Sequence, residues 1–324
     1  MNTMAWLVKR EYWEHRGGFL WTPIWVSAVM LVLTVFGIIT AEVVRARVEV
    51  NGGVPWKVIT ERLTAGDLAQ AGAGLDVAYI ALAGILCIPL FFVLFFYLLG
   101  SLYDDRRDRS VLFWKSLPVT DTGTVLSKVA AAVLLAPFIA FIVATLAWVG
   151  LLVVVAVWAV AHGINPLPAI AASHPFGLFW RMLLTIPVDA LWALPTVGWL
   201  MFWSAFARSK PFLWAVLVPL FVLIANSWLG MLGAPSMSRS FLVEDVLMRL
   251  LFGIFPGAWL SGDGLDLGRH FRGIGDGAEV LGVFDPARVY ALLGTAKLWI
   301  GVVVGAGLIA VSIWLRRTRI ETST

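Results

Sequence analysis

Long runs of apolar residues alternate with short polar segments along the chain. Six runs reach the roughly 20 residues that a helix needs to cross a bilayer. They are continuously apolar rather than alternating, which excludes the strands of a membrane barrel. The pattern predicts an all-α, polytopic integral membrane protein with about six transmembrane helices in a single transmembrane domain over 1–324. The runs lie at about 21–41, 77–102, 129–160, 179–206, 212–232 and 289–314.

The segment before the first run is rich in aromatic and charged residues. Trp6 and Trp13 share a helix face with Arg10. Such a segment is typical of an anchor at the headgroup level or of a helix lying in the membrane plane. We therefore expect an N-terminal interfacial segment over 1–20.

Two other segments between the runs have features of their own. The segment 42–76 mixes charges with glycines and predicts short helices flanking a turn. The segment 233–288 is expected to be an extracytoplasmic loop. Within it, 240–255 interleaves apolar and charged residues, which predicts an amphipathic helix at the membrane surface, followed by Gly-rich turns.

Composition and charge agree with this class and orient it. Hydrophobic residues make up 60% of the chain and charged residues 14%, against roughly 25% charged in soluble proteins. With the N-terminus inside, the inner segments hold 13 Lys and Arg in 61 residues and the outer segments hold 9 in 109. Cytoplasmic segments carry the excess of Lys and Arg, so we expect both termini in the cytoplasm and a multi-pass protein of the cell inner membrane. The same asymmetry accounts for the net charge of +4, so no nucleic-acid partner is needed.

Sequence motifs for catalysis are absent. The chain has no G-x-x-x-x-G-K-[ST], no H-E-x-x-H and no G-x-S-x-G. Its four histidines are scattered, and Cys87 is the single cysteine, which excludes an internal disulfide. We expect a non-catalytic chain with no cofactor and no metal.

The most informative segment lies between the second and third runs and reads LYDDRRDRSVLFWKSLPVTDTGTVLSK. A dense charge cluster precedes two aromatic residues, a combination typical of the anchors of a protein interface. An ordinary polar loop with an interfacial aromatic is the alternative. Asp121 or Thr122 is expected to cap the next helix, which starts near Val125. We expect a cytoplasmic coupling loop over 103–124 whose partner-binding residues are Asp105, Arg106, Arg107, Arg109, Phe113, Trp114 and Lys115.

This segment resembles the membrane subunit, or permease, of ABC exporters of the second type. The resemblance rests on LYDDRRDRSVLFWKSLPV, followed about ten residues later by Lys128. The N-terminal LVKREYWEHRG and the six-span layout are similar to that family as well. The resemblance implies a coupling helix at about 105–118 that docks on a separate ATP-binding-cassette ATPase subunit. It also implies a second permease subunit, in a homodimer or heterodimer, with the translocation pathway between the two.

Charges within the apolar runs are few. Asp189 lies mid-run between Pro187 and Pro195. A charge there is costly in lipid, so it is expected to face protein or water. It either lies on the translocation pathway or locks the bundle by pairing with a Lys or Arg of another span. In the last run, Gly301 and Gly305 form a G-x-x-x-G face suited to close helix packing.

Other functional classes fit the sequence less well. A secondary transporter using an intramembrane carboxylate is the main alternative, but it would need ion sites and often internal repeats, and the chain has one central carboxylate and no repeat. An intramembrane protease would need paired catalytic side chains within the spans. A non-transporting scaffold is the remaining class.

Overall fold

The computed structural model describes residues 3–50, 65–108, 119–261, 282 and 284–318. Within these ranges the chain forms helices and no strand. Six helical segments are long and apolar enough to cross a membrane. This confirms the predicted all-α, polytopic membrane fold. The six segments are Gly17–Arg47, Ala69–Arg107, Asp121–Ala161, Leu167–Phe206, Pro211–Met231 and Ala296–Thr318.

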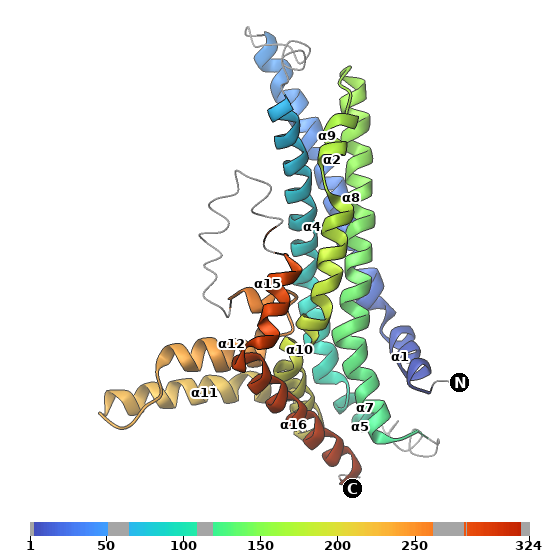
Figure 1. Cartoon of the computed structure of the whole chain (residues 1–324). Coiled ribbons are helices and arrows are strands. Elements are labelled where there is room, and N and C mark those ends of the chain that lie inside the picture. Colours follow the sequence, from blue (N-terminus) through green and yellow to red (C-terminus); the bar gives the residue numbers. More distant parts are fainter. Residues whose placement is uncertain (1–2, 51–64, 109–118, 262–281, 283, 319–324) are drawn as a thin grey trace.

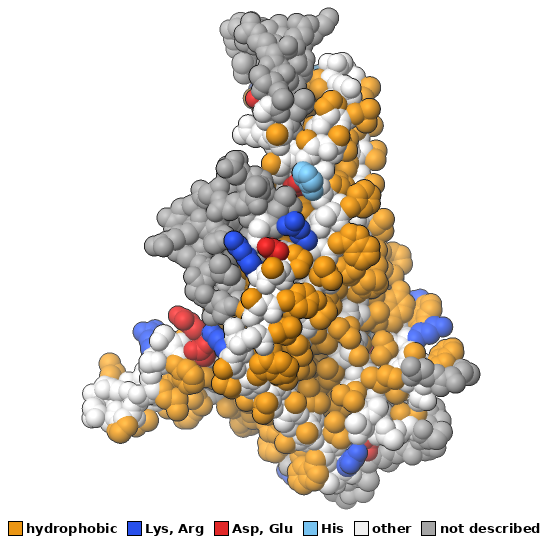
Figure 2. Space-filling model, in the orientation of Figure 1, with side chains coloured by type: hydrophobic (Ala, Val, Ile, Leu, Met, Phe, Trp, Pro, Cys, Tyr) orange, Lys and Arg blue, Asp and Glu red, His pale blue; other side chains and the backbone are white. Residues whose placement is uncertain are grey.

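Four long helices stand side by side in the upper part of the molecule (Figure 1). They are α2 (Thr22–Val50), α4 (Ala65–Gly100), α8 (Ala136–Ala161) and α10 (Pro175–Phe206), with the short α9 (Leu167–Ala172) before α10. The core lies between α4, α10 and the segment leading into α8, where Leu94, Leu98, Val125 and Leu200 are fully buried. On the face shown in Figure 2, apolar side chains spread over the described bundle and charged side chains are few, as lipid contact requires.

The first three apolar runs form helices that extend further than the sequence indicated. Helix α2 continues to Val50 and α4 begins at Ala65, so much of the expected loop 42–76 is helical. The third span begins with α7 (Asp121–Ala130) and continues through the π-helical turn η2 (Ala131–Leu135) into α8. The expected cap at Asp121 or Thr122 was wrong. Thr120 caps α7, accepting a hydrogen bond at 3.1 Å from Gly123 N, so the helix starts four residues before Val125.

The N-terminal segment forms the expected helix, α1 (Thr3–Glu14), which packs on α7. Trp6 and Trp13 remain exposed. A π-helical turn, η1 (Gly17–Trp21), joins α1 to α2 and passes close to α4. A Cβ at Gly18 would lie 2.7 Å from Val93 Cγ1, so only glycine fits this crossing without movement of Val93.

The last predicted run, 289–314, is broken in the structure. Asp285 caps α15 (Pro286–Ala291), a short 3-10 turn follows (η6, Leu292–Gly294), and α16 (Ala296–Thr318) then runs to the end of the described chain. Helix α16 packs along α10. A Cβ at Gly305 would lie 2.4 Å from the carbonyl carbon of Leu194, which confirms the predicted close packing on the glycine face.

The helical part of the predicted amphipathic segment is confirmed. It comprises the π-helix η3 (Phe241–Leu247) and α12 (Met248–Phe252), which return beside α11 (Pro211–Met231); the pair projects sideways from the bundle (Figure 1). Its Arg249 is buried, donates to the carbonyl oxygens of Lys297 at 2.6 Å and Leu298 at 3.3 Å, and lies 4.3 Å from the centre of the Trp192 ring. This arginine thus joins α12 to α10 and α16. The Gly-rich stretch 262–281 lies outside the described residues.

Candidate functional site

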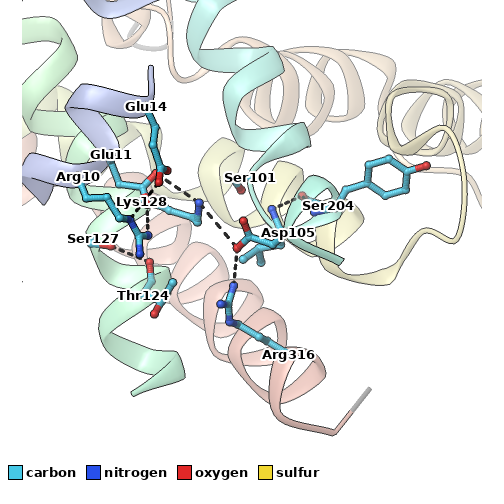
Figure 3. Close-up of polar contacts among 12 residues, drawn as sticks. Arg10, Glu11, Glu14, Ser101, Asp105, Thr124, Ser127, Lys128, Ser204 and Arg316 are labelled. Carbon is cyan, nitrogen blue, oxygen red and sulfur yellow. Dashed lines mark hydrogen bonds and ion pairs between the residues drawn. The ribbon is translucent and has the colours of Figure 1, made fainter. Parts of the chain in front are cut away.

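A buried carboxylate on α1 is the centre of a polar cluster at one end of the bundle. Leu7 and Glu11, four residues apart, share the helix face that packs inward, and the Glu11 side chain is fully buried. Tyr97 donates a hydrogen bond to Glu11 Oε2 at 2.9 Å, and Lys128 Nζ lies 3.3 Å from the same oxygen. Arg10 pairs with Oε1 (Figure 3). Glu11 therefore connects α1 to α4 and α7.

The cluster continues through Lys128 to the last helix. Lys128 Nζ also lies 3.9 Å from Asp105 of the short helix α5 (Tyr103–Arg107). Asp105 Oδ2 accepts from Arg316 of α16 at 2.9 Å (Figure 3). Arg316 Nε also donates to Asp121 Oδ1 at 3.0 Å. Arg316 thus contacts both helices that flank 109–118, α5 through Asp105 and α7 through Asp121.

Helix α5 is also fixed to the end of α10. The backbone N–H groups of Leu102 and Tyr103 donate to Ser204 Oγ at 2.9 and 3.0 Å. Arg106 donates to the carbonyl oxygens of Ser204 at 2.7 Å and Ala207 at 3.0 Å. The carbonyl groups at the C-terminal end of a helix lack partners within it, so Arg106 satisfies them and complements the helix dipole.

The electrostatics of the cluster favour its charged form. Burial raises the pKa of Glu11, but the charges of Lys128 and Arg10 and the hydrogen bonds from Arg10 and Tyr97 outweigh burial and hold the pKa below its ordinary value of 4.5. Three buried or partly buried acids face three cations in the cluster, and the exposed Glu14 also pairs with Arg10 at 3.6 Å. Its members are Arg10, Glu11, Asp105, Asp121, Lys128 and Arg316.

A metal fits this place poorly. Glu11, Glu14 and His15 bring ligand atoms within 4.8 Å of one another. However, the Glu11 carboxylate already accepts hydrogen bonds from Tyr97 and pairs with two cations, which would repel a metal ion. A pocket of about 450 Å³ opens beside these residues, between the η1 turn and α4.

The predicted partner-binding residues fall into two groups. Asp105 and Arg106 contact the bundle as described, and Arg107 is exposed. The other four, Arg109, Phe113, Trp114 and Lys115, lie outside the described residues.

Glu11 was missed by the sequence interpretation, although both it and Lys128 lie in the segments that carry the family resemblance. Each segment holds several charged residues near a span end, and no local pattern singles out Glu11 or Lys128 among them.

Asp189 is held by neutral donors, not by the cation that one of the two alternatives called for. Its Oδ1 accepts from Gly257 N at 3.0 Å and Trp259 Nε1 at 2.9 Å, and its Oδ2 lies 2.8 Å from Thr185 Oγ1. Among the residues that the structure describes, no Lys or Arg pairs with it. Asp189 therefore joins α10 to the segment after α12 through neutral donors.

No protein-family model, no curated protein and no solved structure matches this chain.

Proposed function

We propose that the chain is the permease subunit of an ATP-driven exporter similar to the ABC exporters of the second type, with ATP hydrolysis on a separate partner chain. One observation carries the proposal. The two segments that bear the resemblance, 7–17 and 102–128, are distant in sequence, yet they meet through the buried Glu11–Lys128 pair. Burying two charges is costly. A buried ion pair at this place therefore fits a rigid support for the coupling segment, formed by α5, the start of α7 and α1 and called the loop base below, that must keep its shape under an external force.

The proposed mechanism is mechanical. The segment 105–118 docks on a cytoplasmic ATPase, and closure of two ATPases on ATP displaces it. Asp105 and Arg106 pass the displacement to the ends of α16 and α10, and Lys128 passes it to α1. A second permease subunit, in a homodimer or heterodimer, completes the pathway. Both termini are then cytoplasmic, since α1 and the end of α16 lie at the same end of the bundle as α5 and α7 (Figure 1).

The test asks whether an ATP-binding chain accompanies the protein. The protein is purified from its native membranes in mild detergent after photolabelling with 8-azido-ATP. We expect a labelled partner polypeptide, and we expect Phe113→Ala with Trp114→Ala to remove it, because buried aromatic anchors commonly contribute about 2 kcal/mol or more each.

The matched control is Trp25→Ala with Phe36→Ala, an exposed aromatic pair on α2, which should retain the labelled partner. If the aromatics at 113 and 114 only anchor the loop in lipid, their removal leaves the labelled partner in unchanged amount, and the docking proposal fails.

A second candidate is the secondary transporter, favoured by the place of Asp189 in the wall of an apolar pocket. The same labelling experiment separates the two functions, since a secondary transporter has no ATP-binding partner.

A further inference from the structure

An apolar pocket of about 390 Å³ lies between α4, α10 and the segment 255–260. Its volume falls in the range of about 300–1,000 Å³ that is usual for small-molecule sites. Apart from Asp189, Cys87 and Thr185, the described side chains around it are apolar, among them Ile80, Phe141, Met182 and Trp259. The pocket is therefore an apolar chamber with one carboxylate in its wall.

The carboxylate is oriented but its charge is not balanced by the residues around it. All three donors to Asp189 are neutral, and two of them bind the same oxygen, Oδ1. Oδ2 contacts only Thr185 among the hydrogen bonds of the described residues, and a carboxylate oxygen can accept more than one. No Lys, Arg or His is among the described residues that line the pocket. An ionised carboxylate in such surroundings is costly without a positive partner.

We propose that this pocket binds an amphipathic organic cation with a single ammonium group. The ammonium group pairs with Asp189 Oδ2, and the hydrocarbon part lies against the apolar wall. An inorganic cation fits less well because the described lining offers one carboxylate and no second charged oxygen. The site is separate from the charged cluster at α5, and binding to the chain alone requires no ATPase.

The structure offers a variant that removes the charge and keeps the contacts. Thr185 Oγ1 lies 2.8 Å from both Asp189 Oδ2 and the carbonyl oxygen of Met182, but a hydroxyl has one proton and can donate to only one of them. In Asp189→Asn, the amide oxygen accepts from Gly257 and Trp259, while the amide N–H donates to Thr185 Oγ1. Thr185 then donates to Met182. The amide therefore fits the site without loss of a hydrogen bond.

Two further variants complete the set. Gly84 lines the pocket, and a Cβ there meets no atom within 4 Å, so Gly84→Leu fills space and leaves Asp189 intact. Asp76→Asn is the control. Asp76 is a buried acid of α4, the helix that also holds Gly84. It accepts a hydrogen bond from His174 N at 2.9 Å and does not line the pocket.

The experiment measures binding of radiolabelled decylamine, decanol and decanoate to the purified chain in lipid nanodiscs, with empty nanodiscs as background. We expect saturable binding of decylammonium at one site per chain and none of decanoate. Asp189→Asn should weaken decylammonium binding by about thirtyfold or more, since removing one partner of a buried charge pair is costly. Gly84→Leu should abolish it, and Asp76→Asn should leave it unchanged.

Three results would overturn the proposal. Decanol binding as tightly as decylammonium would show an apolar site that ignores charge. Wild-type affinity in Asp189→Asn would remove the carboxylate from the site. Should Asp189→Asn melt at a lower temperature than wild type, Gly84→Leu decides the matter, and unchanged saturable binding in that variant refutes the pocket as the place of binding.

Discussion

The Glu11–Lys128 pair is the contact on which the proposed loop base depends most. The side chains are 0% and 3% exposed, so removing one partner leaves the other charge buried. Breaking such a pair costs about 3–5 kcal/mol. Lys128→Met should fall near the lower end, at about 3 kcal/mol, because Glu11 keeps Arg10 and the hydroxyl of Tyr97. Glu11→Gln should cost a similar amount, since Lys128 retains only Asp105 in the described residues, at 3.9 Å.

The double variant decides whether the charges interact. With both charges removed, neither is left buried alone, so the double variant should be more stable than the sum of the single losses predicts. We expect a coupling of about 0.5–3 kcal/mol. The free energy of unfolding is measured by titration with dodecyl sulfate in mixed micelles, followed by Trp fluorescence.

The partly exposed pair Lys297–Asp245 serves as the control. Its side chains are 32% and 35% exposed, and such pairs contribute about 0–1 kcal/mol. Single losses at Glu11 and Lys128 that simply add, or a coupling no larger than that of the control pair, would show that the buried pair does not stabilise the loop base.

Three other predictions concern acid, packing and topology. The folded pKa of Glu11 lies below its ordinary value of 4.5. The contribution of Glu11 to the stability of the fold is therefore present above that pH and is lost as the pH falls through the folded pKa. In melting curves, acidification to below about pH 4.5 should destabilise wild type more than Glu11→Gln. Gly305→Val should destabilise by several kcal/mol because a Cβ there overlaps Leu194, whereas Gly307→Val, with nothing within 4 Å, should not; equal dodecyl sulfate midpoints would contradict this packing. Cysteine at Ser236 should react with an impermeant thiol reagent in intact cells and cysteine at Asp108 should not, and labelling at 108 would reverse the orientation.

Much of the fold could be predicted from the apolar runs, since length and continuity alone identify membrane helices. Helix ends were less predictable. Helix α2 continues to Val50 because charged residues end an apolar run without ending a helix, and the break at Thr295 follows Gly294, a residue type that also occurs within α16 at Gly301 and Gly305. The cap at Thr120 was missed because three neighbouring residues, Thr120, Asp121 and Thr122, all have side chains able to cap a helix.

The charged cluster was predictable only in part. Charges near span ends usually indicate solvent or lipid headgroups, and nothing local distinguishes the buried Glu11 from the exposed Glu14. Their difference is a matter of which face of α1 packs on α7. Likewise two of the three partners of Asp189 are a backbone N–H and an indole some 70 residues away in sequence, and neither group carries a charge that a sequence pattern would pair with it.

Helix α10 links the two sites physically. Its end holds α5 through Ser204, and Asp189 lies fifteen residues earlier, about 22 Å along a helix that rises 1.5 Å per residue. Pro195 lies between them and removes a backbone donor from the helix. At that point Gly305 of α16 packs closely, and Thr196 Oγ1 donates to the carbonyl oxygen of Arg249 at 2.6 Å. Between α5 and the pocket, α10 thus lacks one backbone hydrogen bond at Pro195 and is contacted there by α12 and α16. Under the proposed function, the contacts of α12 and α16 at this point determine how α10 responds when the coupling segment moves. Either the whole helix tilts, which changes the position of Asp189, or only the part after Pro195 does, which leaves Asp189 in place.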